Sequence, residues 1–398
     1  MTETLTGVQL WDGEGARGLV DLSWELDGAD AAITGISPAA GPDSGLSVIP
    51  GLIDTHVHLV GYAGEGRADF LSWPLTTRPE EQVLHGLAHA QRALRAGITT
   101  VRDLSADDVQ YSLRRGIEAG LVEGPRVLAH GMVSMTGGHG DLFIPPAVAE
   151  RKSVADGPDA CRALVRAHAR AGADGIKIAT SGGVLSVGDK ASWRNHTDAE
   201  IAAIVDEAHA LGMPVAAHAH TAEGIERALA AGVDSIEHGT LLDAELAARV
   251  VAAGVTVAPT LLINDRIAAG RGASPEQAGK AAELVVRRDA LLRSAADAGV
   301  DFVLGTDANG AHVAFGEELN EVRRMAEVFG WSAERALAAA TSRAAATIGR
   351  ASSLGRIAPG LLADLVVLRG RPWERIEELD AARVVAVVSR GRVVAGAL

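Results

Sequence analysis

The sequence has few of the residues on which several protein classes depend. A single cysteine, Cys161, occurs among 398 residues, which excludes an intrachain disulfide and argues against cysteine-based zinc sites. Aromatic residues make up only 3%, so the core must be built from aliphatic side chains, as suits parallel strands covered by helices. No apolar stretch approaches the roughly 18 to 20 residues of a membrane span, and the N-terminus lacks the pattern of a secretion signal. We therefore expect a soluble protein of the reducing cytoplasm with no membrane partner.

Basic residues are also in deficit. The chain has 37 Lys and Arg against 51 Asp and Glu, a formal net charge of −14. This balance argues against nucleic acid or an anionic membrane surface as the main partner. With 47% hydrophobic and 22% charged residues, the composition excludes a disordered chain and is typical of a globular protein with a large core.

Short runs rich in valine and isoleucine alternate with Ala-rich amphipathic stretches from about residue 48, a pattern typical of repeated βα units. Eight such runs occur, at residues 48–54, 98–103, 126–130, 174–179, 214–218, 234–238, 255–259 and 301–306. Between them lie predicted helices such as 198–211, with Thr197 or Asp198 as the cap. Eight parallel strands, each followed by a helix, predict an α/β fold, the closed (β/α)8 TIM barrel. We expect such an Ala-rich barrel to form a homo-oligomer, although the sequence reveals no interface.

The two ends of the chain depart from the βα pattern. Residues 1–47 and 358–398 contain short strand-like pieces, at 8–10, 22–24, 32–34, 364–368 and 383–388. Neither end has enough apolar residues for a core of its own, so we predict one small β-sandwich domain assembled from both termini. The barrel would then be a separate domain at 48–357. The alternative is two unrelated flaps on the barrel.

Four histidines and one aspartate fall at the ends of predicted barrel strands. His56 and His58 end the first strand, where residues i and i+2 point to the same side and can present two imidazoles to one metal. His218, His238 and Asp307 end the fifth, sixth and eighth strands. Singly, each residue has an ordinary alternative as a structural histidine or a helix cap. Because the carboxyl ends of barrel strands meet at one mouth, we expect these residues to converge there.

Lys177 interrupts the apolar run at 174–179. Burial would depress its pKa and leave a neutral amine. Such an amine can add carbon dioxide to give a carbamate, an anionic ligand able to bridge two divalent metals. The alternative is a lysine that reaches the barrel mouth or pairs with a carboxylate.

The sequence motifs resemble those of the metal-dependent amidohydrolase superfamily. The motifs lie at 48–54, 136–141, Lys177 with 181–184, 218–220, 235–240, 305–307 and 355–368. The likeness covers nearly the whole chain. It is nearest to the branch that holds imidazolonepropionase-like and prolidase-like proteins, the latter including Xaa-Pro and Xaa-Lys/Arg dipeptidases and ochratoxin-type amidases. The resemblance implies an enzyme that hydrolyses carbon–nitrogen bonds with bound metal.

The resemblance also implies a centre of two divalent metal ions, with zinc as the expected metal. The implied ligands are His56, His58 and Asp307 for one ion, His218 and His238 for the other, and carboxylated Lys177 as the bridge. The family's spacing to the strand-six histidine favours His218 over His220 as the ligand, so His220 would face the substrate. His139 resembles a substrate-contacting residue, although a loop shaped by its neighbouring glycines is the alternative.

The expected chemistry follows from charge. Two cations sharing one water would lower its pKa far enough to supply a bridging hydroxide near neutral pH. Asp307 could accept the proton as attack on a carbonyl begins and return it to the departing amine. His220 or His139 could stabilise the developing oxyanion.

The sequence therefore predicts a binuclear hydrolase for a small amide or dipeptide, cleaving N-acyl or N-aminoacyl amino acids as a dipeptidase, carboxypeptidase or amidase. Arg194 or Lys190 could bind the substrate carboxylate, with a solvated loop as the alternative. A hydrolase or deaminase of a cyclic amide or heterocycle is the second hypothesis, but a mononuclear enzyme of this kind needs no lysine ligand. A non-catalytic scaffold is the third hypothesis, and it would be expected to have lost ligands.

Overall fold

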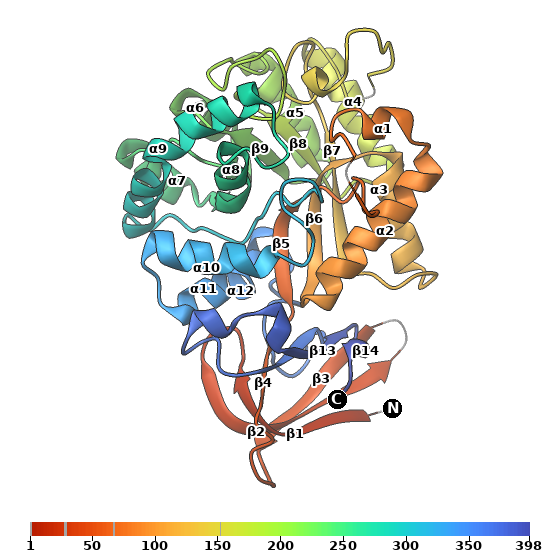
Figure 1. The fold of residues 1–398 in the computed structure, drawn as a ribbon, viewed down its shortest axis with the longest axis vertical. Coiled ribbons are helices and arrows are strands. Elements are labelled where there is room, and N and C mark those ends of the chain that lie inside the picture. The colour runs from red at the N-terminus through yellow and green to blue at the C-terminus, as the bar shows by residue number, and fades with distance from the viewer. Residues whose placement is uncertain (1, 28–29, 67, 152) are drawn as a thin grey trace.

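The computed structural model describes residues 2–27, 30–66, 68–151 and 153–398. Within these residues the strands form a parallel barrel sheet and a separate mixed sheet, each of seven strands (Figure 1). The barrel sheet contains, in order, β5 (Leu52–Val57), β6 (Ile98–Ala106), β7 (Arg126–Met132), β8 (Gly175–Ala179), β9 (Val215–Ala219), β10 (Ser235–His238) and β11 (Thr256–Ala258).

Residues 301–308 lie between β11 and β5, the two edges of the barrel sheet. Val303 N donates to Val257 O at 3.0 Å, and Thr55 N donates to Leu304 O at 2.9 Å. The segment occupies the place of the predicted eighth strand, but it forms isolated bridges with its neighbours rather than a continuous ladder. Asp307, with a φ of 57°, leaves the extended conformation that a strand requires. In the described part of the chain the barrel therefore has seven strands, not eight, and is nearly closed.

The helices lie outside the barrel sheet (Figure 1). They are α1 (Trp73–Thr76), α2 (Pro79–Arg95), α3 (Asp108–Glu118), α4 (Pro158–Ala171), α5 (Asp198–Ala210), α6 (Ala222–Ala231), α7 (Ala244–Ala253), α8 (Leu261–Ala268), α9 (Pro275–Asp297), α10 (Glu318–Phe329), α11 (Ala333–Ala339) and α12 (Ser342–Thr347). At the mouth of the barrel, α1 and α8 also contribute residues to a cavity. The predicted helix at 198–211 is confirmed as α5, and Thr197 Oγ1 caps it by accepting from Glu200 N. Among the described residues, no helix combines the length and the apolar character needed to cross a bilayer.

Both ends of the chain contribute to the mixed sheet, as predicted (Figure 1). Its order is β14 (Arg392–Gly396), β13 (Val384–Ser389), β12 (Leu365–Arg369), β4 (Leu46–Pro50), β1 (Thr2–Trp11), β2 (Ala16–Asp27) and β3 (Asp30–Pro38). Leu22 and Trp24 of β2 pack in the same buried cluster as Leu365 and Val388. The strands thus form a single mixed sheet with a shared core, whereas the sequence predicts a β-sandwich.

The first predicted run, at 48–54, divides at Gly51 between the two sheets. β4 before it pairs with β1 and β12, whereas β5 after it pairs with β6. A Cβ at Gly51 would lie 2.2 Å from Thr99 Oγ1, so a side chain cannot fit at this crossing. Val48, where we placed the start of the barrel domain, therefore lies in the mixed sheet.

Candidate metal centre

The carboxyl ends of the barrel strands surround a cavity of about 310 Å³. All six ligands predicted from the sequence line it: His56, His58, Lys177, His218, His238 and Asp307. His139 and His220 line it as well. The structure thus brings the six predicted ligands together from five different parts of the chain, as the strand-end argument requires, and His139 joins them from a sixth.

His56, His58 and Asp307 form the first group of potential ligands. Asp307 Oδ1 lies 3.1 Å from His58 Nε2 and 3.7 Å from His56 Nε2. The segment that carries Asp307 is tied to β5, because Thr306 Oγ1 donates to Asp54 Oδ2 at 2.6 Å. Although burial opposes the effect, the two neighbouring histidines lower the pKa of Asp307 to about 2, so the carboxylate is anionic.

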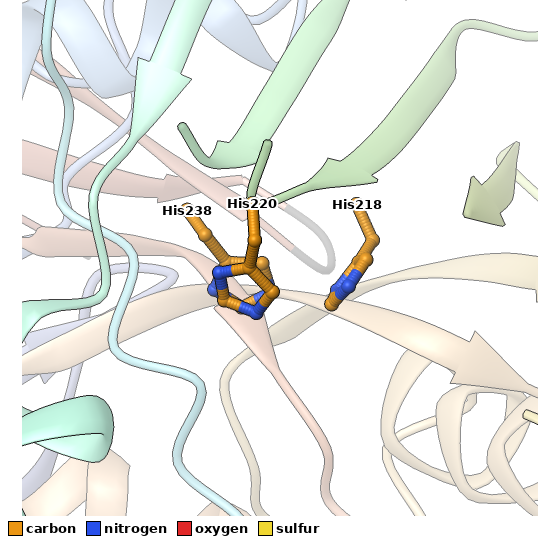
Figure 2. Close-up of side chains that lie close together, drawn as sticks. All are labelled: His218, His220 and His238. Atoms are coloured by element: carbon orange, nitrogen blue, oxygen red, sulfur yellow. The ribbon is translucent and has the colours of Figure 1, made fainter. Parts of the chain in front are cut away.

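His218, His220 and His238 form the second group (Figure 2). Their ligand atoms lie within 4.8 Å of one another, and all three residues are buried. The His220 and His238 rings stack at 4.4 Å, with the His218 ring nearly perpendicular to both. His218 Nε2 donates to Gly182 O at 3.2 Å, which leaves Nδ1 free to bind a metal. Since all three can reach one ion, the preference for His218 over His220 stays a prediction.

Hydroxyl groups orient the other two rings of this group. Nδ1 of His238 lies 2.7 Å from Thr260 Oγ1, and Nδ1 of His220 lies 2.8 Å from Thr240 Oγ1. Both rings therefore keep Nε2 available as a ligand atom. Burial lowers the pKa of both imidazoles, to about 3 for His220, so they are neutral at pH 7 and offer a lone pair.

Lys177 is buried in the wall of the cavity, with 3% of its surface exposed. Its Nζ has no hydrogen-bond partner among the described residues. Burial lowers its pKa to about 8, against the opposing effect of Glu237 and Asp307. An unpartnered buried amine among imidazoles and a carboxylate fits a centre for borderline divalent metals, which prefer nitrogen and oxygen ligands of these kinds.

Glu237 is a functional candidate that the sequence analysis missed. Its Oε2 lies 2.9 Å from His56 Nδ1, and its Oε1 accepts from Arg102 at 2.8 Å and from Ser235 Oγ at 2.7 Å. Although burial opposes the effect, Arg102 and His56 hold the pKa of Glu237 well below its usual range. A charged residue beside His238 in a buried strand was the signal that could have revealed it.

His139 reaches the cavity from the loop after β7. Its ring stacks on that of His218 at 4.1 Å. A Cβ at Gly183 would lie 2.1 Å from His139 Nδ1, so only glycine allows the ring to approach the chain here. The backbone N–H of His139 donates to Asn195 Oδ1 at 2.6 Å. The glycine-rich sequence therefore shapes the place of His139 in the cavity.

Most of the remaining cavity wall is apolar. The apolar lining includes Phe70, Leu71, Leu75, Leu104, Phe143, Ile144, Val184, Leu185, Ile263 and Ile267. Lys177 is the only lysine or arginine that lines the cavity in the described part of the chain. Arg194 and Lys190 are exposed and do not line it. The structure thus does not bring Arg194 to the site, because its loop turns toward solvent.

Comparison with known proteins identifies the family. A model of the amidohydrolase family matches residues 47–394. The chain belongs to the amidohydrolase family. Ochratoxinase from Aspergillus niger is 30% identical over 366 residues, which cover 86% of this chain and 74% of the relative.

Two solved structures each match 99% of this chain, across 99% of their own length. A Xaa-Pro dipeptidase with bound methionine is 32% identical, with a TM-score of 0.89. A prolidase complexed with N-methylphosphonate-L-proline is 34% identical, with a TM-score of 0.88. The protein is thus a hydrolase of amide bonds, in a family whose members generally use divalent metals.

We expect Glu237→Gln to weaken metal binding by this amidohydrolase. The change keeps the size of the side chain but removes the negative charge beside His56 Nδ1, so metal affinity or activity should fall by about 10- to 100-fold. Zinc affinity, measured by competition with a chelating dye, tests this. Glu226→Gln is the matched control, because Glu226 forms an exposed ion pair with Arg249. Equal affinities for the two variants would contradict a positioning role for Glu237.

Proposed function

We propose that this amidohydrolase is a binuclear enzyme, with zinc as the expected metal, that hydrolyses N-acyl or N-aminoacyl amino acids. The observation that carries the proposal is the buried Lys177 Nζ, which lacks a hydrogen-bond partner in the described chain and faces the same cavity as the other five ligands. A neutral amine in this place can add carbon dioxide. The carbamate, formed with loss of one proton to solvent, would supply the anionic ligand that two cations need to lie close together.

The proposed ligands are His56, His58 and Asp307 for one ion, His218 and His238 for the other, and carboxylated Lys177 for both. When bound, the ions would lower the pKa of a water and polarise the scissile carbonyl. Asp307 would accept the proton that this water loses and return it to the departing amine. His139 would donate a hydrogen bond to the oxygen on which negative charge develops, and so would His220 in the tautomer that carries hydrogen on Nε2 while Nδ1 accepts from Thr240 Oγ1.

Hydrolysis assays test this proposal directly. The purified chain should hydrolyse N-acyl amino acids or dipeptides, lose activity after chelation, and regain it with zinc. A metal-loaded chain that cleaves no amide would instead support the scaffold hypothesis.

A second candidate is a hydrolase of neutral cyclic amides. The observation that favours it is the cavity wall, where Lys177 is the only described lysine or arginine. If Lys177 is carboxylated, the described wall offers histidines and neutral amides, such as Asn264 and Asn309, to a substrate carboxylate. A neutral substrate with a large apolar group would fit this wall without an ion pair.

We expect free N-acyl amino acids, their methyl esters and lactams to separate the two candidates. A higher kcat/KM for the free acids supports the first candidate, and a preference for lactams supports the second. Because Arg194 is exposed outside the cavity, Arg194→Ala should change kcat/KM by less than about twofold for acid and ester alike, as exposed positions usually do. A rise in KM confined to the free acid would return Arg194 to the site.

A further inference from the structure

A thiol, an imidazole and a carboxylate converge at a second place, outside the catalytic cavity. Cys161 lies in α4, His196 precedes α5, and Glu200 lies in its first turn. One ligand atom from each residue lies within 4.8 Å of the other two. The exposed fractions are 0% for Cys161, 1% for His196 and 8% for Glu200.

The His196 ring points an unused lone pair into this cluster. Nε2 lies 3.2 Å from Val133 O, and a carbonyl can only accept, so Nε2 carries the hydrogen. Burial lowers the pKa of His196, so the ring is neutral and the lone pair is on Nδ1. This buried Nδ1 has no hydrogen-bond partner among the described residues.

A charged acceptor lies close to this lone pair. Glu200 Oε2 lies 3.9 Å from His196 Nδ1. Although burial opposes the effect, hydrogen bonds from Thr197 and Gly157 lower the pKa of Glu200, so its carboxylate is charged. Glu200 Oε2 already accepts from Thr197 N at 2.6 Å and from Thr197 Oγ1 at 2.9 Å, whereas the buried His196 Nδ1 beside it is unsatisfied, which is costly. A cation between the two groups would bind the free lone pair of His196 Nδ1 and pair with the negative charge of Glu200.

We propose that Cys161, His196 and Glu200 form a structural site for a divalent ion of the zinc type, separate from the catalytic centre. Zinc takes sulfur, nitrogen and carboxylate oxygen ligands at about 2.0–2.3 Å, which in a tetrahedral site separates ligand atoms by roughly 3.3–3.8 Å. The observed separations, 3.9 Å between His196 Nδ1 and Glu200 Oε2 and within 4.8 Å for the three ligand atoms, would shorten to this range when the ion binds. The single cysteine of the chain argues against zinc sites built mainly from cysteine, but this site needs only one cysteine.

Binding of the ion at this site releases one proton. Burial raises the pKa of the Cys161 thiol to about 11, so the thiol is protonated when no ion is bound. The Sγ–H bond breaks as the Sγ–metal bond forms, and the proton leaves to solvent.

The proposed ion would stabilise the loop that carries His139. His196 N donates to Met135 Sδ at 2.8 Å, and the adjacent Asn195 accepts from His139 N. An ion bound by Cys161 and His196 would therefore connect α4 to the segment before α5, and through that segment's hydrogen bonds to the loop that carries His139. This gives the site a structural role next to the catalytic cavity.

Cobalt spectroscopy tests the proposal on the full chain. Cys161 is the only cysteine, and none of the proposed catalytic ligands contains sulfur, so a sulfur-to-cobalt charge-transfer band reports on this site alone. Adding Co²⁺ to the chelated protein should produce this band, which should saturate at one cobalt per chain. Cys161→Ser should abolish the band and remove one bound ion per chain. Zinc should displace the cobalt and erase the band.

Two further variants keep the test independent of folding and of the proposed function. Lys177→Ala should lose catalytic cobalt but keep the band. His196→Asn tolerates the local φ of 58° and should lose the band. Absence of the band in the wild-type chain, or a full band in His196→Asn, would overturn the proposal. A band without catalytic cobalt would support this site and contradict the binuclear proposal.

Discussion

Lys177→Ala is expected to remove catalytic metal and activity together. The change deletes the only residue proposed to bridge both ions, so their mutual repulsion is no longer offset. Turnover should fall by more than the roughly 10- to 100-fold that loss of an outer partner causes. Elemental analysis and hydrolysis assays measure both effects. Using the Cys161→Ser background restricts the count to catalytic ions.

Lys190→Ala is the matched control, because Lys190 is exposed outside the cavity. It should keep its metal and its turnover. Formate or acetate should partly restore activity to Lys177→Ala, since a short carboxylate can occupy the space of the carbamate. If Lys177→Ala keeps both catalytic ions and normal turnover, the bridging assignment is wrong.

Asp307→Asn should largely retain metal while turnover falls by roughly 10²- to 10⁴-fold, the range typical of general acid–base residues. Asparagine preserves the shape and one weak ligand oxygen but removes the basic carboxylate. It also tolerates the φ of 57° at this position, so we expect the fold to persist. Metal content and kcat, measured on the same preparation, separate ligation from proton transfer.

Asp301→Asn is the control for Asp307→Asn in the same segment. Asp301 forms an exposed ion pair with Arg343, so its loss should leave turnover nearly unchanged. A fall of less than tenfold in Asp307→Asn with its metal intact would rule out the proton-transfer role.

The positions of the candidate ligands were predictable because strand order alone determines which residues reach the barrel mouth. His56, His218 and His238 needed only the βα alternation and their place at the ends of strands. The same reasoning placed Lys177 in the wall, because a lysine within a buried strand has few other positions. The order of the strands was sufficient for each of these residues.

Contacts between segments that are distant in the sequence could not be predicted from residue spacing. Glu237 contacts His56 and Arg102 across the barrel, and no sequence period reports such a pair. Arg194 lies outside the cavity, and periodicity could not show this because the direction of its loop depends on turns. The run at 48–54 looks like one strand in the sequence, because its apolar pattern is continuous through Pro50 and Gly51. At these two residues the chain nevertheless passes from the mixed sheet to the barrel sheet.

The pairing of β4 with β12 sets the order in which this molecule can be completed during synthesis. Residues 51–364 separate the two strands. At about 5–20 residues per second, the ribosome needs tens of seconds to make them. Throughout that time β4 presents one unpaired edge, and such edges invite pairing with other chains. Slower translation therefore lengthens the exposure of nascent β4, and soluble yield should depend on elongation rate and chaperone supply more than the stability of the finished fold suggests.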